Sequence, residues 1–219
     1  MTTPRDLCAA LAADDASTRL RAALTAGSAP DPALGGVLVE RCAAEPDPFV
    51  RDMLSWALTR LPAADVLPRL RVELGSPRPR ARAQALHTLS KIADPSTWPW
   101  VTRDLLRDPD DDVARTAWRT AVVLAPTGER AALAGELAGQ LGRGDRDVRL
   151  SLSRALVALG DTAGAALARA SEDPDPAVAA HARATVALRA DPDTGFDAAV
   201  AEARRVVALG PGRGTMAGC

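Results

Sequence analysis

Apolar residues recur with helical spacing in several separate stretches of the chain. In each stretch, small or apolar residues follow a first core residue at four, seven or eight, and eleven positions further on, which is one face of an α-helix. Asp, Ser or Pro precedes each stretch, and Pro or Gly usually ends it, as expected at helix boundaries. The pattern therefore predicts an all-α protein. One such face comprises Val148, Leu152, Ala155, Leu156 and Leu159.

The same helical pattern repeats along the chain at nearly constant intervals. The first core residues Val50, Ala81, Val113, Val148 and Val178 are spaced 31, 32, 35 and 30 residues apart. A weaker copy begins 32 residues before the first of them. A second, shorter helical run separates consecutive copies, so that each repeat is a helical hairpin. These shorter runs are expected at residues 32–42, 66–74, 98–106, 129–141 and 162–170.

One helical hairpin cannot bury its apolar stripe alone, so neighbouring hairpins must stack. We therefore expect an α-α superhelix, a curved solenoid of about six helical hairpins. A last helix at residues 196–209 would cover the open end as a cap. Residues 4–209 then form one repeat domain. Residues 210–219 contain four glycines and are predicted to be a flexible tail.

The second helix of each repeat resembles that of HEAT repeats, which typically begins with Asp and a Val-Arg pair before alternating small and large apolar residues. Val50-Arg51 and Val148-Arg149 match this pair, and Ala81-Arg82 matches in part. The resemblance implies an interaction fold and no particular activity. Residues 39–92 also resemble the HEAT-type segment beside MerR-type regulators of high-GC bacteria, which implies transcriptional regulation or complex assembly. The winged-helix reader of those regulators is absent.

Composition and charge narrow the classes of function. The 219 residues carry a net charge of −1, which argues against a surface built wholly for nucleic acid or anionic membrane. Arginine is far more frequent than lysine, which occurs only at Lys91, and this bias indicates a GC-rich bacterial genome. No signal-peptide pattern and no long apolar run is present. We therefore expect a cytoplasmic protein that does not enter membranes.

The residues that commonly carry catalysis are scarce and dispersed. His87 and His181 lie in different repeats and cannot share a site, and no nucleotide-binding, zinc-protease or serine-hydrolase motif occurs. The three cysteines form no metal-binding or disulfide pattern. The acidic run at 108–112 lacks calcium-loop spacing and is interpreted as helix capping. The sequence therefore predicts no enzyme, no metal site and no cofactor.

Stacked hairpins leave one surface common to all repeats, the side of each second helix turned away from the core. Positions two, six and nine after the first core residue lie on this side, which lines the concave groove of HEAT-like solenoids. The middle repeats place Trp56, His87, Arg115, Arg119 and Arg154 there, whereas the last repeat has alanines. Arginine and aromatic residues are favoured at binding hot spots. We expect these residues to bind a protein or peptide partner with an acidic surface.

Two alternatives of other classes remain open. Arg71, Arg78, Arg80 and Arg82 could form a basic patch, so that the groove binds nucleic acid instead. Alternatively, Cys219 on the glycine-rich tail could serve as a tether or as the substrate of a modifying enzyme. The sequence identifies neither the partner nor the oligomeric state.

Overall fold

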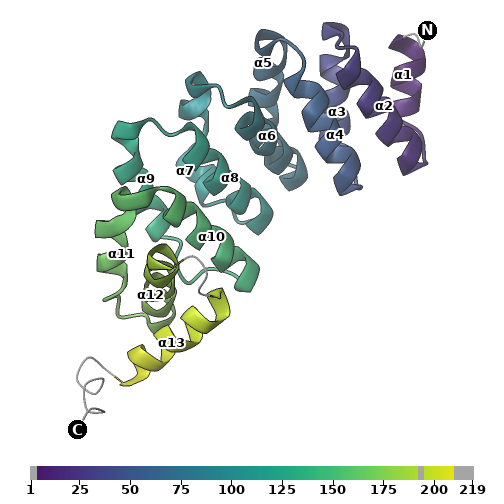
Figure 1. Cartoon of the computed structure of the whole chain (residues 1–219). Helices are drawn as coiled ribbons and strands as arrows, with labels where there is room; N and C mark the ends of the chain where they lie inside the picture. The colour runs from purple at the N-terminus through teal and green to yellow at the C-terminus, as the bar shows by residue number, and fades with distance from the viewer. Residues whose placement is uncertain (1–3, 192–194, 210–219) are drawn as a thin grey trace. The chain divides into compact units, whose positions relative to one another are not determined.

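A computed structural model describes residues 4–191 and 195–209 of the chain. Within these ranges all regular structure is helical, as predicted. The predicted tail at 210–219, with Cys219, lies outside the described residues. The α-helices are α1 (Pro4–Leu11), α2 (Ala16–Ser28), α3 (Gly35–Ala44), α4 (Pro48–Thr59), α5 (Ala63–Leu74), α6 (Pro79–Ile92), α7 (Arg103–Leu106), α8 (Asp111–Leu124), α9 (Arg130–Ala138), α10 (Arg146–Ala158), α11 (Gly164–Ala170), α12 (Pro176–Ala190) and α13 (Phe196–Leu209) (Figure 1).

The chain divides into two compact units, unit 1 up to Leu124 and unit 2 from Ala125 onward. In unit 1 the second helices of the hairpins pack in chain order, α2 on α4, α4 on α6 and α6 on α8. The first helix of each hairpin packs on the second, so α1, α3, α5 and α7 contact α2, α4, α6 and α8 respectively. The first core residues Val50, Ala81 and Val113 are each at most 1% exposed. The repeat read from the sequence is therefore a repeat of stacked helix pairs.

Unit 2 continues the same pattern with α10 packed on α12 and with α9 and α11 beside them. Val148 is buried, and Val178 is half-buried against the turn at Gly142. The last helix, α13, has the predicted bounds and packs on α12 (Figure 1). Both units are thus all-α solenoid structures built from helix pairs.

Four of the shorter helices start differently from the prediction, because a 3₁₀ turn comes first. These turns are η1 (Pro32–Leu34), η2 (Pro95–Trp100), η3 (Thr127–Glu129) and η4 (Gly160–Ala163). The prediction of a single helix at 98–106 is wrong. Pro99 lies inside η2, and Thr102 starts a separate helix, α7, by accepting a hydrogen bond from the Leu105 N–H at 3.4 Å. Proline has no N–H to donate and disfavours helical conformation in the residue before it.

Arginines directly after the first core residue hold the loops between helices in unit 1. Arg19, Arg51 and Arg82 each donate to a backbone carbonyl five or six residues upstream. Arg19 also binds Glu45, and Arg82 binds Asp108, in both cases with two hydrogen bonds to a carboxylate 26 residues later. At Arg19 and Arg82 this arginine is therefore a packing residue that joins one hairpin to the loop of the next, whereas Arg51 holds the loop within its own hairpin.

Buried hydroxyl groups also link neighbouring second helices at equivalent positions. Ser55 on α4 lies 3.3 Å from the hydroxyl of Thr88 on α6, and Ser153 on α10 lies 2.7 Å from that of Thr185 on α12. Thr120 on α8 donates to the Leu86 carbonyl of α6 at 3.0 Å. These hydrogen bonds satisfy polar groups that water cannot reach, as burial requires. They also define which helix positions face each other.

Candidate interaction surface

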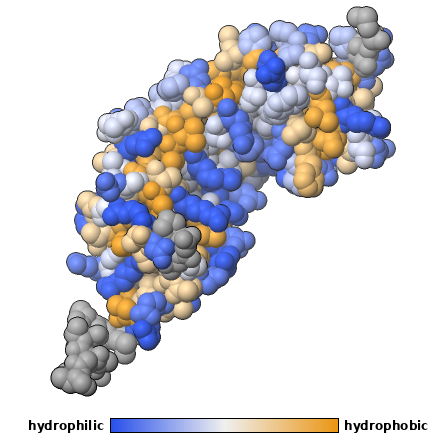
Figure 2. All heavy atoms as spheres, in the orientation of Figure 1, coloured by the Kyte–Doolittle hydropathy of each residue, from blue (hydrophilic) through white to orange (hydrophobic). Residues whose placement is uncertain are grey.

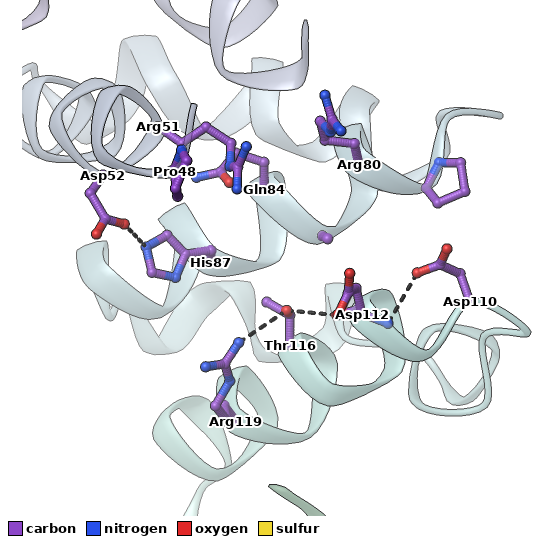
Figure 3. Close-up of a pocket in the computed structure, with 12 residues that line it drawn as sticks. Pro48, Arg51, Asp52, Arg80, Gln84, His87, Asp110, Asp112, Thr116 and Arg119 are labelled. Carbon is purple, nitrogen blue, oxygen red and sulfur yellow. Dashed lines mark hydrogen bonds and ion pairs between the residues drawn. The ribbon is translucent and has the colours of Figure 1, made fainter. Parts of the chain in front are cut away.

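The second helices α4, α6 and α8 of unit 1 together line a cavity of about 560 Å³, here called the unit 1 cavity (Figure 3). A volume of this size is within the range of ligand pockets in proteins. Its lining is mostly polar and includes both charges. The lining residues are Pro48, Arg51, Asp52, Pro79, Arg80, Ala83, Gln84, His87, Asp110, Asp112, Thr116 and Arg119.

His87 lies on α6 and faces the cavity between α4 and α8. Its Nε2 atom is 3.6 Å from an oxygen of Asp52 on α4. Burial lowers the pKa of His87, the charge of Lys91 lowers it further, and Asp52 opposes both effects. The imidazole is therefore neutral near neutral pH and can both donate and accept a hydrogen bond.

Arg119 lies on the facing side of the cavity, on α8. Its guanidinium donates to the Thr116 hydroxyl at 3.2 Å, and among the described residues it makes no ion pair (Figure 3). Partial burial and the neighbouring charge of Arg115 lower the pKa of Arg119. Arg115 itself lies 3.7 Å from a carboxylate oxygen of Asp112. Arg119 therefore keeps donors free for an anionic group in the cavity.

Arg80 is a second cation of the cavity without an internal partner. It is exposed near the start of α6 and makes no hydrogen bond or ion pair with any described residue (Figure 3). In contrast, Asp110 uses one carboxylate oxygen to accept from the backbone N–H groups of Asp112 and Val113 at the start of α8. Asp110 thus caps α8, as the sequence predicted for this acidic run. Part of the negative charge of the cavity is therefore used to cap a helix, whereas Arg80 and Arg119 make no ion pair with any described residue.

Trp56 does not line the cavity, although its sequence position is equivalent to that of His87 and Arg119. Its ring lies over Gly27 of α2, where an added Cβ would come within 2.1 Å of the indole. The residue remains 37% exposed. The absence of a side chain at Gly27 thus leaves space for the ring to pack against α2, so that only part of its surface is exposed to solvent.

Two of the five predicted partner-binding residues line the unit 1 cavity. His87 and Arg119 share the unit 1 cavity, Arg115 touches its edge through Asp112, and Trp56 packs on α2. Arg154 is in unit 2 and lines a different cavity.

The four arginines of the predicted basic patch make different contacts, although Arg71 and Arg82 line one pocket. Arg80 lines the unit 1 cavity, and Arg78 lies 3.7 Å from Glu73. The guanidinium of Arg71 lies over the Trp100 ring, 5.2 Å from its centroid, in a cation–π contact. Arg82 is held by Asp108 and by the Ser76 carbonyl. Of the four, Arg80 is thus the one that has no hydrogen-bond or ion-pair partner among the residues described by the structure.

The outward positions considered in the sequence were two, six and nine after the first core residue, and two cavity residues at position three were missed. Gln84 on α6 and Thr116 on α8 line the cavity three positions after the first core residue. On a helix this position is next to the ones that hold His87 and Arg119. A wider sector of the helical wheel would have included them. Arg51 was recognised as part of the repeat motif, but its second role in lining the cavity needs the packing of α4 on α6.

A buried Ser–His pair in unit 2 was not foreseen. The Ser153 hydroxyl and the Nε2 atom of His181 are 3.0 Å apart. The Gly142 N–H donates to Nδ1 of His181, so Nε2 carries the proton and also reaches the Arg149 carbonyl at 3.0 Å. Nε2 therefore cannot take a proton from the serine, as a general base must. Both side chains are at most 2% exposed, so this pair has a structural role.

The thiol of Cys42 is also buried. Burial raises the pKa of the Cys42 thiol to about 12, and the described cysteines, Cys8 and Cys42, are free. The described part of the chain contains no cluster of His, Cys, Asp and Glu able to hold a metal ion. No helix within residues 4–191 and 195–209 is long and apolar enough to span a membrane.

Comparison with known proteins agrees with the fold. The class that the fold defines is the all-α solenoid of stacked helix pairs. Residues 36–123 match the family model described as HEAT repeats, and every residue that lines the unit 1 cavity lies in this range. The match supports the resemblance to HEAT repeats over this part of the chain.

One solved structure covers nearly the whole chain. It is the complex of CpcE and CpcF of phycocyanin lyase from Nostoc sp. PCC7120, which is 17% identical, aligns over 94% of each chain and has a TM-score of 0.41. A likeness of this degree carries no argument about function. No curated protein matches the chain.

Proposed function

We propose that the chain is a non-catalytic protein-interaction module whose unit 1 cavity binds an acidic segment of a partner protein. The observation that carries the proposal is the cavity of about 560 Å³ that α4, α6 and α8 line, in which Arg80 and Arg119 make no ion pair with any residue that the structure describes. HEAT-type helix pairs, matched over residues 36–123, are an interaction fold, which supports a protein partner.

The charges of the cavity support an anionic ligand. Three arginines and three aspartates line it, but the aspartates have neighbours within the fold. Asp110 caps α8, Asp112 lies near Arg115, and Asp52 lies near His87. An acidic side chain of a partner can therefore reach Arg80 or Arg119 without displacing an internal carboxylate. Guanidinium groups recognise carboxylates through paired hydrogen bonds.

The side chains of this surface favour an extended segment over a closely packed helix. Trp56, His87 and Arg119 occupy the equivalent outward positions of α4, α6 and α8. Bulky side chains keep another backbone at a distance, because the separation of packed helices depends on the side chains at the contact. An extended segment can place single side chains between them. The neutral His87 and the amide of Gln84 can supply hydrogen bonds to its backbone.

The non-enzymatic role, the cytoplasmic location and a link to transcriptional regulation or complex assembly are parts of this proposal. The buried Ser153–His181 pair and the inert Cys42 support the absence of catalysis. The nucleic-acid alternative has less support, because Arg78 and Arg82 lie against carboxylates and Arg71 lies on Trp100.

The test begins with a photo-crosslinking amino acid at Ala83, which lines the cavity, and at Val72, which is 75% exposed and does not line it. A partner crosslinked from Ala83 and not from Val72 is then purified, and its Kd for the wild-type chain is measured. Replacing Arg80 and Arg119 together by Ala should weaken binding by at least about thirtyfold, because hot-spot residues contribute about 2 kcal/mol or more.

The matched control replaces Arg60 and Arg169 by Ala, which removes the same charge. Both are exposed, and neither lines the unit 1 cavity. This control should change the Kd by no more than about twofold. Equal loss of affinity in the two double variants would show that net charge, and not the cavity, attracts the partner.

A further inference from the structure

Unit 2 contains a second cavity, of about 470 Å³, which we call the unit 2 cavity. It lies where α10, α12 and the start of α13 meet. Its lining differs from that of the unit 1 cavity, because it is apolar except for two arginines. The lining residues are Arg146, Leu150, Arg154, Val157, Ala158, Leu188 and Phe196.

Helix α13 occupies the outward face of α12 beside this cavity. Ala180 and Ala184 of α12 pack against Ala199 and Ala203 of α13, and all four are at most 6% exposed. Small side chains on both helices allow this close approach. The outward alanines that the sequence showed on the last repeat therefore pack against α13. The capping helix thus covers the outward face of α12.

The first turn of α13 shows how this surface holds an apolar group and a carboxylate together. Phe196 is 7% exposed, forms one wall of the unit 2 cavity and meets the His181 ring edge to face at 6.1 Å. The next residue, Asp197, accepts two hydrogen bonds from Arg146 of α10, at 2.7 and 2.8 Å. An aromatic side chain followed by an acid is thus a pair that this surface already binds.

Arg154 offers the same kind of contact and has no internal ligand. It is exposed on α10, lines the cavity, and makes no hydrogen bond or ion pair with any residue in the described ranges. Leu150, Val157 and Leu188 are half-buried and form apolar walls near it. A cation at the rim of an apolar cavity fits an apolar group that carries a negative charge.

We infer that the unit 2 cavity is a second docking site, which takes a large apolar side chain of a partner peptide while Arg154 binds a carboxylate adjacent to it. The cavity opens to solvent where Arg154 and Ala158 are exposed, so a peptide backbone can remain outside while one side chain enters. The inference goes beyond the proposed function, because it concerns another cavity, another arginine and an apolar specificity.

The test uses a capped, fluorescein-labelled peptide in which a Phe-Asp pair is flanked by Gly and Ser on each side. Its binding to the full chain is measured by fluorescence polarisation and compared with Phe-Asn and Ala-Asp versions. Each replacement should raise the Kd about tenfold, because one loses the charge and the other loses the buried ring. In Arg154→Gln the Phe-Asp and Phe-Asn peptides should bind equally.

The control Arg169→Gln removes an exposed arginine of α11 that does not line the cavity, and it should keep the preference for Phe-Asp. Circular dichroism of both variants checks that the helices are retained. Absence of peptide binding at about 1 mM would overturn the inference, as would a preference for Phe-Asp that survives Arg154→Gln. Binding of dodecanoate that depends on Arg154, without peptide binding, would identify a lipid site instead and also overturn it.

Discussion

Arg82 and Asp108 join two consecutive helix pairs of unit 1 through two hydrogen bonds, 2.8 and 2.9 Å long, across 26 residues of sequence. Their side chains are only 15% and 7% exposed. A paired carboxylate in this position also raises the pKa of Arg82 through its hydrogen bonds. The contact matters for stability because breaking a buried ion pair leaves one charge uncompensated.

Replacing Arg82 by Ala should lower the free energy of unfolding by about 3 kcal/mol, because the buried Asp108 would lose two hydrogen bonds from a cation. Urea unfolding followed by circular dichroism measures the change. Arg80→Ala is the matched control, since Arg80 is exposed and makes no internal ion pair, and it should change stability by less than about 0.5 kcal/mol. Similar losses in the two variants would contradict a packing role for Arg82.

Glu45→Gln should destabilise the protein at neutral pH and have little effect in acid. Burial of Glu45 opposes its ionisation, but hydrogen bonds from Arg19, the Asp47 N–H and Arg41 outweigh burial and lower its pKa to about 2. A carboxyl whose pKa is lower in the folded state stabilises the fold above its unfolded pKa, near 4.5, and this stability is lost as pH falls toward 2.

The contribution of Glu45 is about 3 kcal/mol at pH 7, from the size of this pKa difference. Urea unfolding of wild type and Glu45→Gln at pH 7 and pH 3 should therefore show a gap that narrows in acid. Glu40→Gln, on the exposed side of α3, is the control. A gap that stays constant with pH would show that the effect of Glu45→Gln is steric.

His181 should make the protein less stable as the pH falls from 6.5 to 4. Burial lowers the pKa of His181 to about 4, although the hydrogen bond to the Arg149 carbonyl opposes this. The folded state therefore holds the neutral form, while the unfolded chain takes up a proton below about pH 6.5. Stability from this residue is complete above pH 6.5 and is lost progressively toward pH 4.

Between pH 7 and pH 5 this loss amounts to about 2 kcal/mol. Urea unfolding at the two pH values measures it, and NMR titration of the imidazole gives the pKa directly. In His181→Gln the dependence on pH in this interval should weaken to the part that comes from His87, whose pKa is also lowered by burial, whereas His87→Gln should keep the loss of about 2 kcal/mol that comes from His181. An unshifted titration of His181 near pH 6.5 would be inconsistent with its burial.

Gly27→Ala should move the Trp56 ring, because the new Cβ would lie 2.1 Å from the indole. Alanine favours the helix by about 1 kcal/mol, but the displaced ring should make the variant less stable by about 1–3 kcal/mol. The indole N–H resonance of Trp56 measures the displacement. Gly128→Ala, where no atom lies within 4 Å of an added Cβ, should leave this resonance unchanged.

Local patterns were sufficient to predict most of the helices, because helix boundaries and buried faces depend on nearby residues. The spacing of Val50, Ala81 and Val113 identified the stacked pairs, and the helix at 196–209 was confirmed with its predicted bounds. The prediction was wrong at 98–106, where Pro99 and the Thr102 cap divide the expected helix into η2 and α7. Both signals were local, and giving them greater weight would have predicted the break.

The candidate site was predicted less well, because helix periodicity gives the direction of a side chain and not its neighbours. It placed His87 and Arg119 at equivalent outward positions, and in the structure both line one cavity. It could not show that the Trp56 ring packs over Gly27, because this contact depends on how α4 packs on α2. Nor could it distinguish Arg80, which makes no internal ion pair, from Arg82, which is neutralised by a carboxylate far along the chain.

By itself, the sequence determined the helical class, the repeat and the outward positions of each second helix, since these follow from the periodicity of a helix and the need to bury apolar surface. Tertiary structure decided which polar groups remain available. Contacts between residues 26 to 51 positions apart pair Arg19, Arg82 and Arg146 with carboxylates. Within the described ranges, Arg119 and Arg154 have no such contact. Such contacts depend on how whole helices pack, which no local pattern of residues records.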